Sequence, residues 1–251
     1  RDFIQKSSLV ALASSINISN GFSHSLINSN PIQMDESNLN FPSNASKKLT
    51  ELLNIKYPII QAPTAGVINS AFTAAVSNNG ALGALPLSWS TPGHAEQQIN
   101  AIKEKTNRSF FANFVLNFEP KAFEMAIKKK VPIIQFSWGM PTIEMVNKMK
   151  AHKVVLGIQV TSELSAKKAI SLGADYLVCQ GVEAGGHVHA SRPLADTLKQ
   201  VLKVAKNIPV VASGGIATGY KMREYMQMGA AGVVMGSRFV ATKESNGHDV
   251  Y

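Results

Sequence analysis

Residues 208–239 read IPVVASGGIATGYKMREYMQMGAAGVVMGSRF, and this stretch holds one complete repeat of the fold. Two short apolar runs, 208–215 and 231–239, flank a segment with helical spacing at 219–230. Continuous apolar runs are typical of strands buried on both faces, and a helix between two such strands favours parallel pairing. The stretch therefore predicts a strand–helix–strand unit with parallel strands.

The same pattern extends back along the chain to Tyr57. Further apolar runs alternate with helical segments, and they lie at 57–63, 81–86, 110–116, 131–139, 153–160 and 175–181. Eight such units predict an α/β protein that forms a closed (β/α)8 TIM barrel. The alternative is an open doubly wound sheet, but no long crossover marks a reversal of strand order.

The predicted barrel domain covers residues 47–251. No helical segment follows the eighth apolar run, and the span from Tyr57 to Tyr251 is shorter than the roughly 250 residues typical of such barrels. We therefore expect the domain to be C-terminally incomplete, without its last helix and a lid over the pocket.

Residues 1–46 form an irregular N-terminal extension in this interpretation. Arg1-Asp2-Phe3 and the short apolar stretch behind it resemble the second half of a twin-arginine export signal, which favours export to the periplasm. The alternative is an ordinary amphipathic helix on a cytoplasmic protein. Residues 17–46 are rich in Asn and Ser without hydrophobic periodicity, which is typical of a linker.

Composition excludes several function classes. The formal charge is +9, but the lysines are spread over many predicted helices, and no zinc spacing or aromatic RNA-binding motif accompanies them. This argues against nucleic-acid binding and in favour of anionic small molecules. Cys179 is the single cysteine, so we expect no internal disulfide and a buried thiol. No apolar stretch reaches the ~20 residues of a membrane helix, and nothing in the sequence indicates an oligomeric state.

Small residues follow the last two predicted strands. The active site of a TIM barrel lies at the C-terminal ends of its strands, and the loops after strands 7 and 8 commonly bind phosphate. Here these loops carry Ser213, Gly214 and Gly215, then Gly236 and Ser237. Their backbone N–H groups are expected to converge on a phosphate, although glycines of this kind also occur in simple tight turns.

Amide side chains end three other predicted strands, at Gln61, Asn113 and Gln159. Amides donate and accept hydrogen bonds without charge, which suits a planar ligand with ring N–H and C=O groups. No lysine lies at a strand end to form a Schiff base, and no cluster of three metal ligands is present, so no metal site is predicted. The alternative is that amides are merely tolerated at these positions.

Residues 180–190, QGVEAGGHVHA, leave the sixth strand and cannot pack as core. Gly185 and Gly186 permit positive φ and a close approach of the backbone to a ligand. His187 supplies a group that titrates near neutral pH, which makes it the candidate catalytic residue, although many loop histidines are only exposed. We interpret Glu183 as an acid that orders the loop and His189 as an exposed residue.

The motifs QAPTAGV, FANF, FSWGMP, GIQV, CQGVEAGGHVH, ASGGIATG and MGSRFVATKES occur in this order. In that order they resemble the nitronate monooxygenase family, formerly called 2-nitropropane dioxygenases, over about residues 50–251. The resemblance implies a TIM barrel that binds FMN non-covalently and uses His187 as its catalytic histidine. The implied FMN-binding residues are Gln61, Ala62, Pro63, Thr64, Asn113, Gln159, Gly181, Gly185, Gly186, Ser213, Gly214, Gly215, Gly236 and Ser237.

The implied reaction is FMN-dependent oxidation of alkyl nitronates by O₂ to a carbonyl compound and nitrite. Neutral nitroalkanes become substrates if His187 removes their α-proton. The alternatives are an FMN-dependent NAD(P)H reductase of the enoyl-acyl carrier protein reductase or quinone reductase type, and a phosphate-binding barrel without redox activity. The sequence departs from the family's pattern at two places. Thr64 replaces a common Met beside the expected flavin, and Val188-His189-Ala190 replaces the frequent continuation of the loop, which bears on substrate access.

Overall fold

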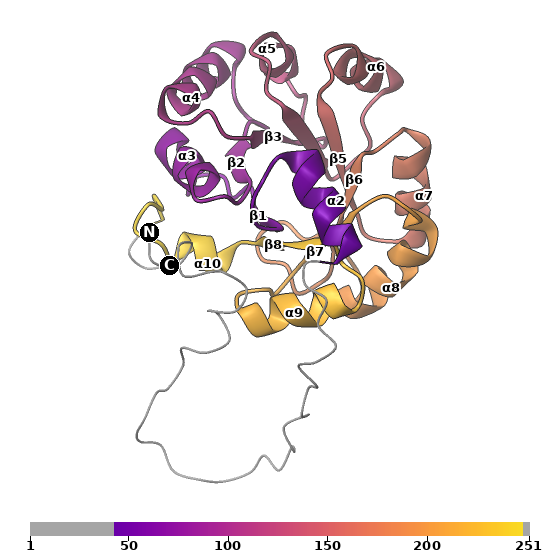
Figure 1. Ribbon diagram of the computed structural model, residues 1–251. Coiled ribbons are helices and arrows are strands. Elements are labelled where there is room, and N and C mark those ends of the chain that lie inside the picture. The colour runs from indigo at the N-terminus through magenta and orange to yellow at the C-terminus, as the bar shows by residue number, and fades with distance from the viewer. Residues whose placement is uncertain (1–42, 248–251) are drawn as a thin grey trace, which may run out of the picture.

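The computed structural model describes residues 43–247, and in them eight parallel strands form a closed barrel (Figure 1). The strands follow one another around the sheet in the order β1-β8-β7-β6-β5-β4-β3-β2. Their bounds are β1 (Ile59–Gln61), β2 (Gly83–Pro86), β3 (Phe110–Val115), β4 (Ile133–Ser137), β5 (Val155–Val160), β6 (Tyr176–Gln180), β7 (Val210–Ser213) and β8 (Gly232–Met235). A parallel bridge between Ile60 and Leu82 joins β1 to β2. The predicted TIM barrel is confirmed, and the open sheet is excluded.

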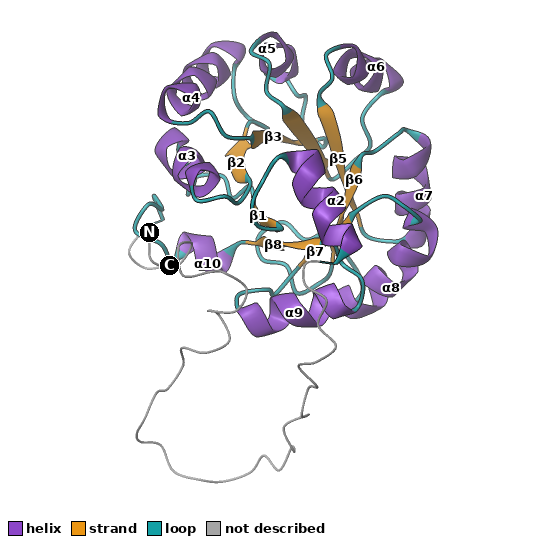
Figure 2. Ribbon diagram, in the orientation of Figure 1, coloured by secondary structure: helices purple, strands orange, loops and turns teal. Residues whose placement is uncertain are grey.

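Helices surround the strands, as Figure 2 shows. They are α3 (Ser70–Asn78), α4 (Pro92–Lys105), α5 (Phe123–Lys128), α6 (Ile143–Ala151), α7 (Glu163–Ser171), α8 (Leu194–Ala205), α9 (Gly219–Gln227) and α10 (Ser237–Val240). Side-chain caps begin five of them: Asn69, Thr91, Thr142, Ser162 and Thr218 each accept a bond from a first-turn N–H. These caps are the start signals by which the sequence places the helices.

One further helix, α2 (Asn44–Leu53), lies across the N-terminal end of the barrel (Figure 1). Leu49 and Leu53 are fully buried there against side chains from inside the barrel. The helix begins three residues before the expected Lys47, because the Ser43 hydroxyl accepts a bond from the Ser46 N–H at 3.2 Å. The predicted linker boundary at residue 46 was therefore wrong by three residues, since the helix begins at Asn44. The export-like segment lies outside the described residues.

Inward-facing side chains change in character along the strands. On β3 and β4 the inward positions near the N-terminal end are Phe111 and Ile133, which pack in the apolar interior. Two residues further along each strand come the buried amides Asn113 and Gln135. Because successive inward residues in a strand are two apart, the barrel has an apolar lower half and a polar mouth at its C-terminal end.

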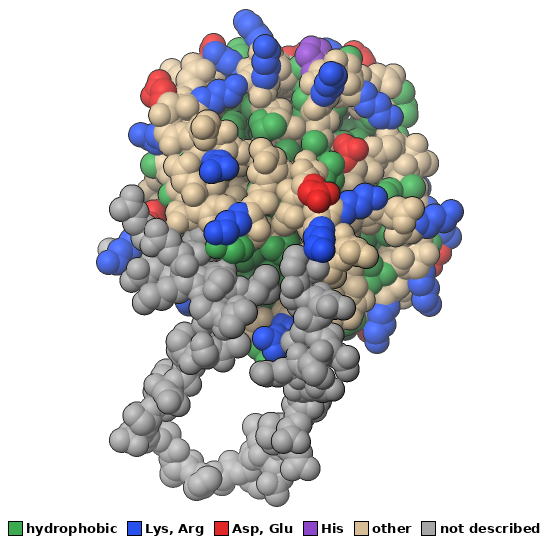
Figure 3. All heavy atoms as spheres, in the orientation of Figure 1, with side chains coloured by type: hydrophobic (Ala, Val, Ile, Leu, Met, Phe, Trp, Pro, Cys, Tyr) green, Lys and Arg blue, Asp and Glu red, His purple; other side chains and the backbone are tan. Residues whose placement is uncertain are grey.

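Beyond β8 the described chain contains the four-residue α10, a turn over residues 241–244 and an irregular segment up to residue 247. None of the helices within residues 43–247 is long and apolar enough to span a membrane. Figure 3 shows the Lys and Arg side chains dispersed over the face that carries α2, without the continuous stripe typical of a nucleic-acid interface.

Candidate active site

Polar side chains line the mouth of the barrel at the C-terminal ends of β3 and β4. Asn113 is 2% exposed, and its Oδ1 accepts bonds from the Ser137 hydroxyl at 3.0 Å and from Gln135 Nε2 at 3.3 Å. The Tyr176 hydroxyl in turn donates to Gln135 Oε1 at 3.1 Å. This network fixes the orientation of the Asn113 amide and leaves its Nδ2 without a partner among residues 43–247, so a ligand can use that donor.

Gln159 is the second amide of the mouth and is half-buried on β5. Its side chain makes no hydrogen bond to any other described residue, unlike Asn113. A half-buried amide with both groups available is suited to contact a polar ring. Asn113 and Gln159 belong to β3 and β5, which lie on either side of β4, and their contact with one ligand stays a prediction.

Gln61 lies in the seam between β1 and β2. Its Oε1 accepts the Ala84 N–H at 2.9 Å, and the side chain is fully buried. Its other polar atom, Nε2, has no partner among the described residues. The amide oxygen thus takes the place of a backbone acceptor for the Ala84 N–H. The predicted contact between Gln61 and a ligand ring can therefore involve only Nε2, and it stays a prediction.

The turn after β1 folds back onto the end of β8. The Ala62 N–H donates to the Met235 carbonyl at 2.8 Å, and the Thr64 N–H donates to the Ala62 carbonyl at the same distance. A Cβ on Gly236 would lie 3.5 Å from Ala62 Cβ. The predicted residues Ala62, Pro63 and Thr64 are therefore brought next to the Gly236 turn, and all three are half-buried.

The glycine turns after β6 and β7 lie against each other. Gly214 and Gly215 have φ values of 139° and 62°. A Cβ at Gly214 would lie 3.2 Å from the Ala184 N atom, and one at Gly215 would lie 3.1 Å from Glu183 Cβ. Only glycine combines these backbone angles with so close a contact.

Six backbone N–H groups on these loops have no acceptor among the described residues. They belong to Gly185, Gly186, Gly214, Gly215, Gly236 and Ser237, at the ends of three neighbouring strands. A Cβ added to Gly185 or Gly186 would meet no other atom within 4 Å, so the space beside both glycines is open. Unpaired N–H groups on adjacent turns form an anion-binding surface. Ser213 ends β7 beneath it.

Gly181 has a structural role instead. A Cβ there would clash with the Leu194 Cβ, so glycine lets the end of β6 pack directly on the start of α8. Its contact with a cofactor stays a prediction. Glu183 reaches the same helix: its two carboxylate oxygens accept the Leu194 N–H at 2.9 and 3.1 Å. The interpretation of Glu183 as a loop-ordering acid is confirmed.

His187 is exposed on this loop, and its ring makes no hydrogen bond to a described residue. Its carbonyl accepts bonds from Gln180 Nε2 and Trp138 Nε1, both at 3.4 Å. The Trp138 ring meets the His187 ring edge-on at 5.9 Å and stacks on the His189 ring at 5.1 Å. His189 is exposed as predicted, but it is also held by its N–H bond to Gln180 Oε1 at 2.9 Å.

Sequence reasoning missed the roles of Gln135, Gln180 and Trp138. The two glutamines carry a signal, because each lies two residues after an inward-facing apolar residue of its strand. Trp138 carries none: its backbone is left-handed, with φ 60°, a conformation that sequence does not indicate for tryptophan.

Other reactive groups do not compete with His187. Cys179 is fully buried as predicted, and burial raises the pKa of its thiol to about 12, so it stays neutral. Residues 43–247 contain no group of three His, Cys, Asp or Glu side chains that could hold a metal ion.

A family model described as nitronate monooxygenase matches residues 46–130 and 118–251, which together cover most of the chain. The chain belongs to the nitronate monooxygenase family. A probable nitronate monooxygenase of Staphylococcus saprophyticus is 32% identical over 252 residues, covering 82% of this chain and 71% of that protein. The resemblance is thereby confirmed.

The chain is also similar to a curated dehydrogenase and to two solved enzyme structures. One curated relative is named as a dehydrogenase of a hydroxy-methyl-oxo-octahydroindene carboxyl-CoA, from Rhodococcus jostii. It is 35% identical, over 78% of this chain and 56% of its own length. Among solved structures, FabK from Thermotoga maritima superposes with a TM-score of 0.76 at 32% identity, over 81% of this chain and 65% of that one. Nitroalkane oxidase from Streptomyces ansochromogenes superposes with a TM-score of 0.74 at 28% identity, over 80% of this chain and 70% of that one. This family member is an oxidoreductase.

Proposed function

We propose that the chain binds FMN at the C-terminal mouth of the barrel and oxidises alkyl nitronates with O₂. The observation that carries the proposal is the set of six unpaired N–H groups on the turns after β6, β7 and β8, next to the exposed ring of His187. An FMN phosphate is a dianion that such N–H groups bind without a dedicated side chain.

The polar mouth fits the remainder of FMN. Asn113 Nδ2 and the Gln159 amide are available to the ring N and C=O groups of an isoalloxazine, and the half-buried turn 62–64 lies beside the Gly236 turn. When bound, FMN supplies the redox chemistry between the nitronate and O₂, with a carbonyl compound and nitrite as products.

His187 has two uses, which depend on the charge of the substrate. With a neutral nitroalkane, a ring nitrogen of His187 removes the α-proton and so creates the nitronate. With a preformed nitronate, the same ring orients the anion by donating a hydrogen bond. The Gln180 and Trp138 bonds to the His187 carbonyl restrain the backbone that carries the ring.

The first experiment measures flavin content and anaerobic reduction. We expect purified protein to show flavin absorption that a nitronate bleaches without oxygen and that NADH does not. Gly214→Asp should expel the flavin, because it strains the turn and places a carboxylate against the phosphate. Full flavin content in that variant would remove the phosphate site from the proposal.

The second experiment replaces the histidine. His187→Asn should retain flavin but lose turnover of neutral nitroalkanes by about a hundredfold or more, with a smaller loss for preformed nitronates. The control is His152→Asn, because His152 directly follows α6 and its ring bonds the Lys148 carbonyl, away from the barrel mouth. Unchanged nitroalkane turnover in His187→Asn would exclude a catalytic role.

A reductase is the second candidate, since the similar solved structures include FabK and the curated relatives include a dehydrogenase. Its flavin site would be the same, and only the electron donor would differ. Anaerobic bleaching by NADH but not by a nitronate would favour it. Protein with no flavin absorption would instead favour the phosphate-binding barrel without redox activity.

A further inference from the structure

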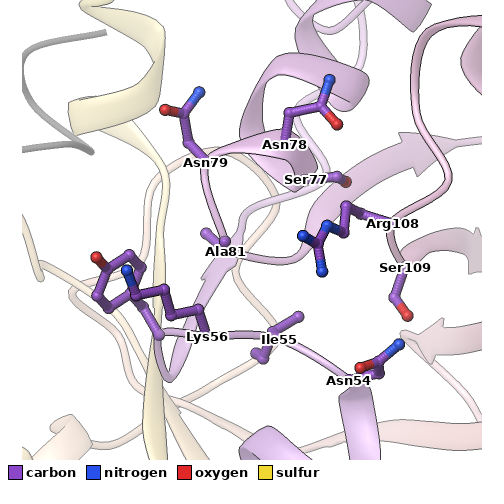
Figure 4. Close-up of a pocket in the computed structure, with 11 residues that line it drawn as sticks. Asn54, Ile55, Lys56, Ser77, Asn78, Asn79, Ala81, Arg108 and Ser109 are labelled. Atoms are coloured by element: carbon purple, nitrogen blue, oxygen red, sulfur yellow. The ribbon is translucent and has the colours of Figure 1, made fainter.

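A separate pocket lies at the N-terminal end of the barrel, opposite the loop that carries His187. It has a volume of about 470 Å³ and is formed by the segment after α2, the end of α3 and the residues before β3 (Figure 4). This volume exceeds what a lone inorganic anion needs and lies in the range of small-molecule sites, roughly 300–1,000 Å³.

The lining of this pocket carries positive charge and no carboxylate. Arg108 reaches inward from the side of β3, and Lys56 lies along the opposite side (Figure 4). The Arg108 guanidinium makes no ion pair with a described residue, and Lys56 Nζ lies 5.1 Å from the centre of the Tyr57 ring. Two cations without acidic partners favour an anionic ligand.

Ser77 forms part of the inner wall of the pocket. It lines the same pocket, it is 2% exposed, and its hydroxyl has no hydrogen-bond partner among the described residues. A buried hydroxyl without a partner is unfavourable unless a ligand or water completes it. This hydroxyl lies against Gly83 of β2, where an added Cβ would be 2.6 Å from its oxygen, so the charge of the pocket comes from Arg108 and Lys56.

The walls of the pocket are fixed before any ligand arrives. Both polar atoms of the Asn78 side chain are bonded: its Oδ1 accepts from the Thr106 hydroxyl at 2.5 Å, and its Nδ2 donates to the Lys105 carbonyl at 3.0 Å. The Gly80 carbonyl accepts the N–H groups of both Lys56 and Tyr57 at 2.9 Å. Free carbonyls beyond the end of α3 would repel an anion, and the Gly80 carbonyl is occupied by these two bonds.

We propose that this pocket is a second ligand site that binds the phosphate of a small phosphate monoester, separate from the redox site. The planar guanidinium of Arg108 pairs with two phosphate oxygens, as arginine side chains commonly do. Lys56 adds charge that a dianion uses better than a monocarboxylate does, and the remaining volume holds the organic part.

The test titrates AMP, inorganic phosphate and acetate into the intact protein by calorimetry at low ionic strength. We expect AMP to bind more tightly than inorganic phosphate and acetate not to bind. Arg108→Gln should weaken AMP binding at least fivefold, and the double variant Lys56→Gln/Arg108→Gln at least tenfold. Raising the salt concentration should also weaken binding severalfold, because both cations are exposed.

Two control variants separate this site from net charge and from the barrel mouth. Lys121→Gln removes an exposed lysine from the loop after β3, at the other end of the barrel, and should change AMP affinity less than twofold. Gly214→Asp disables the predicted phosphate site at the mouth and should leave AMP binding in the pocket unchanged. The titrations are run with and without excess FMN, so that AMP bound at the unpaired N–H groups of the mouth is measured separately.

Several results would overturn the proposal. They are an equal loss in Lys121→Gln, loss in Gly214→Asp but not in Arg108→Gln, equal affinity for AMP and inorganic phosphate, or no AMP binding at all. The last result would assign Arg108 and Lys56 to compensating the C-terminal ends of α2 and α3.

Discussion

Trp138 has a left-handed backbone, with φ 60°, directly after the last residue of β4. Such a conformation in a bulky residue costs free energy and persists where the surroundings demand it. Here it aims one indole at two histidines, edge-on to His187 and stacked on His189. Trp138 is therefore a positioning residue for the loop that carries His187.

Replacing the indole while keeping an aromatic ring tests this role. Trp138→Phe removes the N–H that donates to the His187 carbonyl, and a neutral bond of this kind is worth about 0.5–1.5 kcal/mol. Because the bond is long, we expect kcat/KM for a nitroalkane to fall by about threefold, with unchanged flavin content.

The chain's other tryptophan supplies the control. Trp89→Phe should leave kcat/KM unchanged, since the Trp89 ring packs on Phe118 instead of the histidine loop. If both variants lose activity equally, the bond from Trp138 does not position His187.

At the scale of elements, α2 covers the N-terminal end of the barrel and packs its apolar side chains into it. Leu49 and Leu53 lie on one face of this helix and contact the apolar interior of the barrel. Their spacing of four residues is the helical period that predicts an amphipathic segment. Sequence could therefore identify the helix, but not that its partner would be the interior of the barrel.

Leu53→Ala should lower the free energy of unfolding by about 2–5 kcal/mol, because it leaves a cavity in the barrel floor. Urea denaturation measures this change. Lys47→Ala on the exposed face of the same helix should change stability by less than about 0.5 kcal/mol. Equal effects of the two substitutions would mean that α2 does not pack into the barrel.

For the whole molecule, closure of the barrel depends on the seam between β1 and β2. Backbone pairing there is limited to the bridge of Ile60 with Leu82, and Gln61 Oε1 accepts the next N–H of β2, from Ala84. The side chain completes the ring of hydrogen bonds that removes sheet edges.

Gln61→Leu should destabilise flavin-free protein by about 1–3 kcal/mol, since it leaves the buried Ala84 N–H without an acceptor. The matched variant is Gln159→Leu, whose amide has no described partner; it should weaken flavin binding without lowering the stability of flavin-free protein. Unfolding curves and flavin titrations of both variants measure the two effects. The reverse pattern would assign Gln61 to the cofactor and not to the seam.

The sequence by itself determined the repeating units, the TIM barrel, the polar ends of β3 and β5, and the glycine turns beside His187. Each depends on a local pattern: apolar runs, helix caps, and glycines within a few residues of a strand end. Only the tertiary structure decided that Gln61 closes a seam, that Trp138 contacts both histidines, and that Arg108 shares a pocket with Ser77. These contacts join residues far apart in the chain, and they depend on which way each side chain points after the barrel has closed, which local periodicity does not encode.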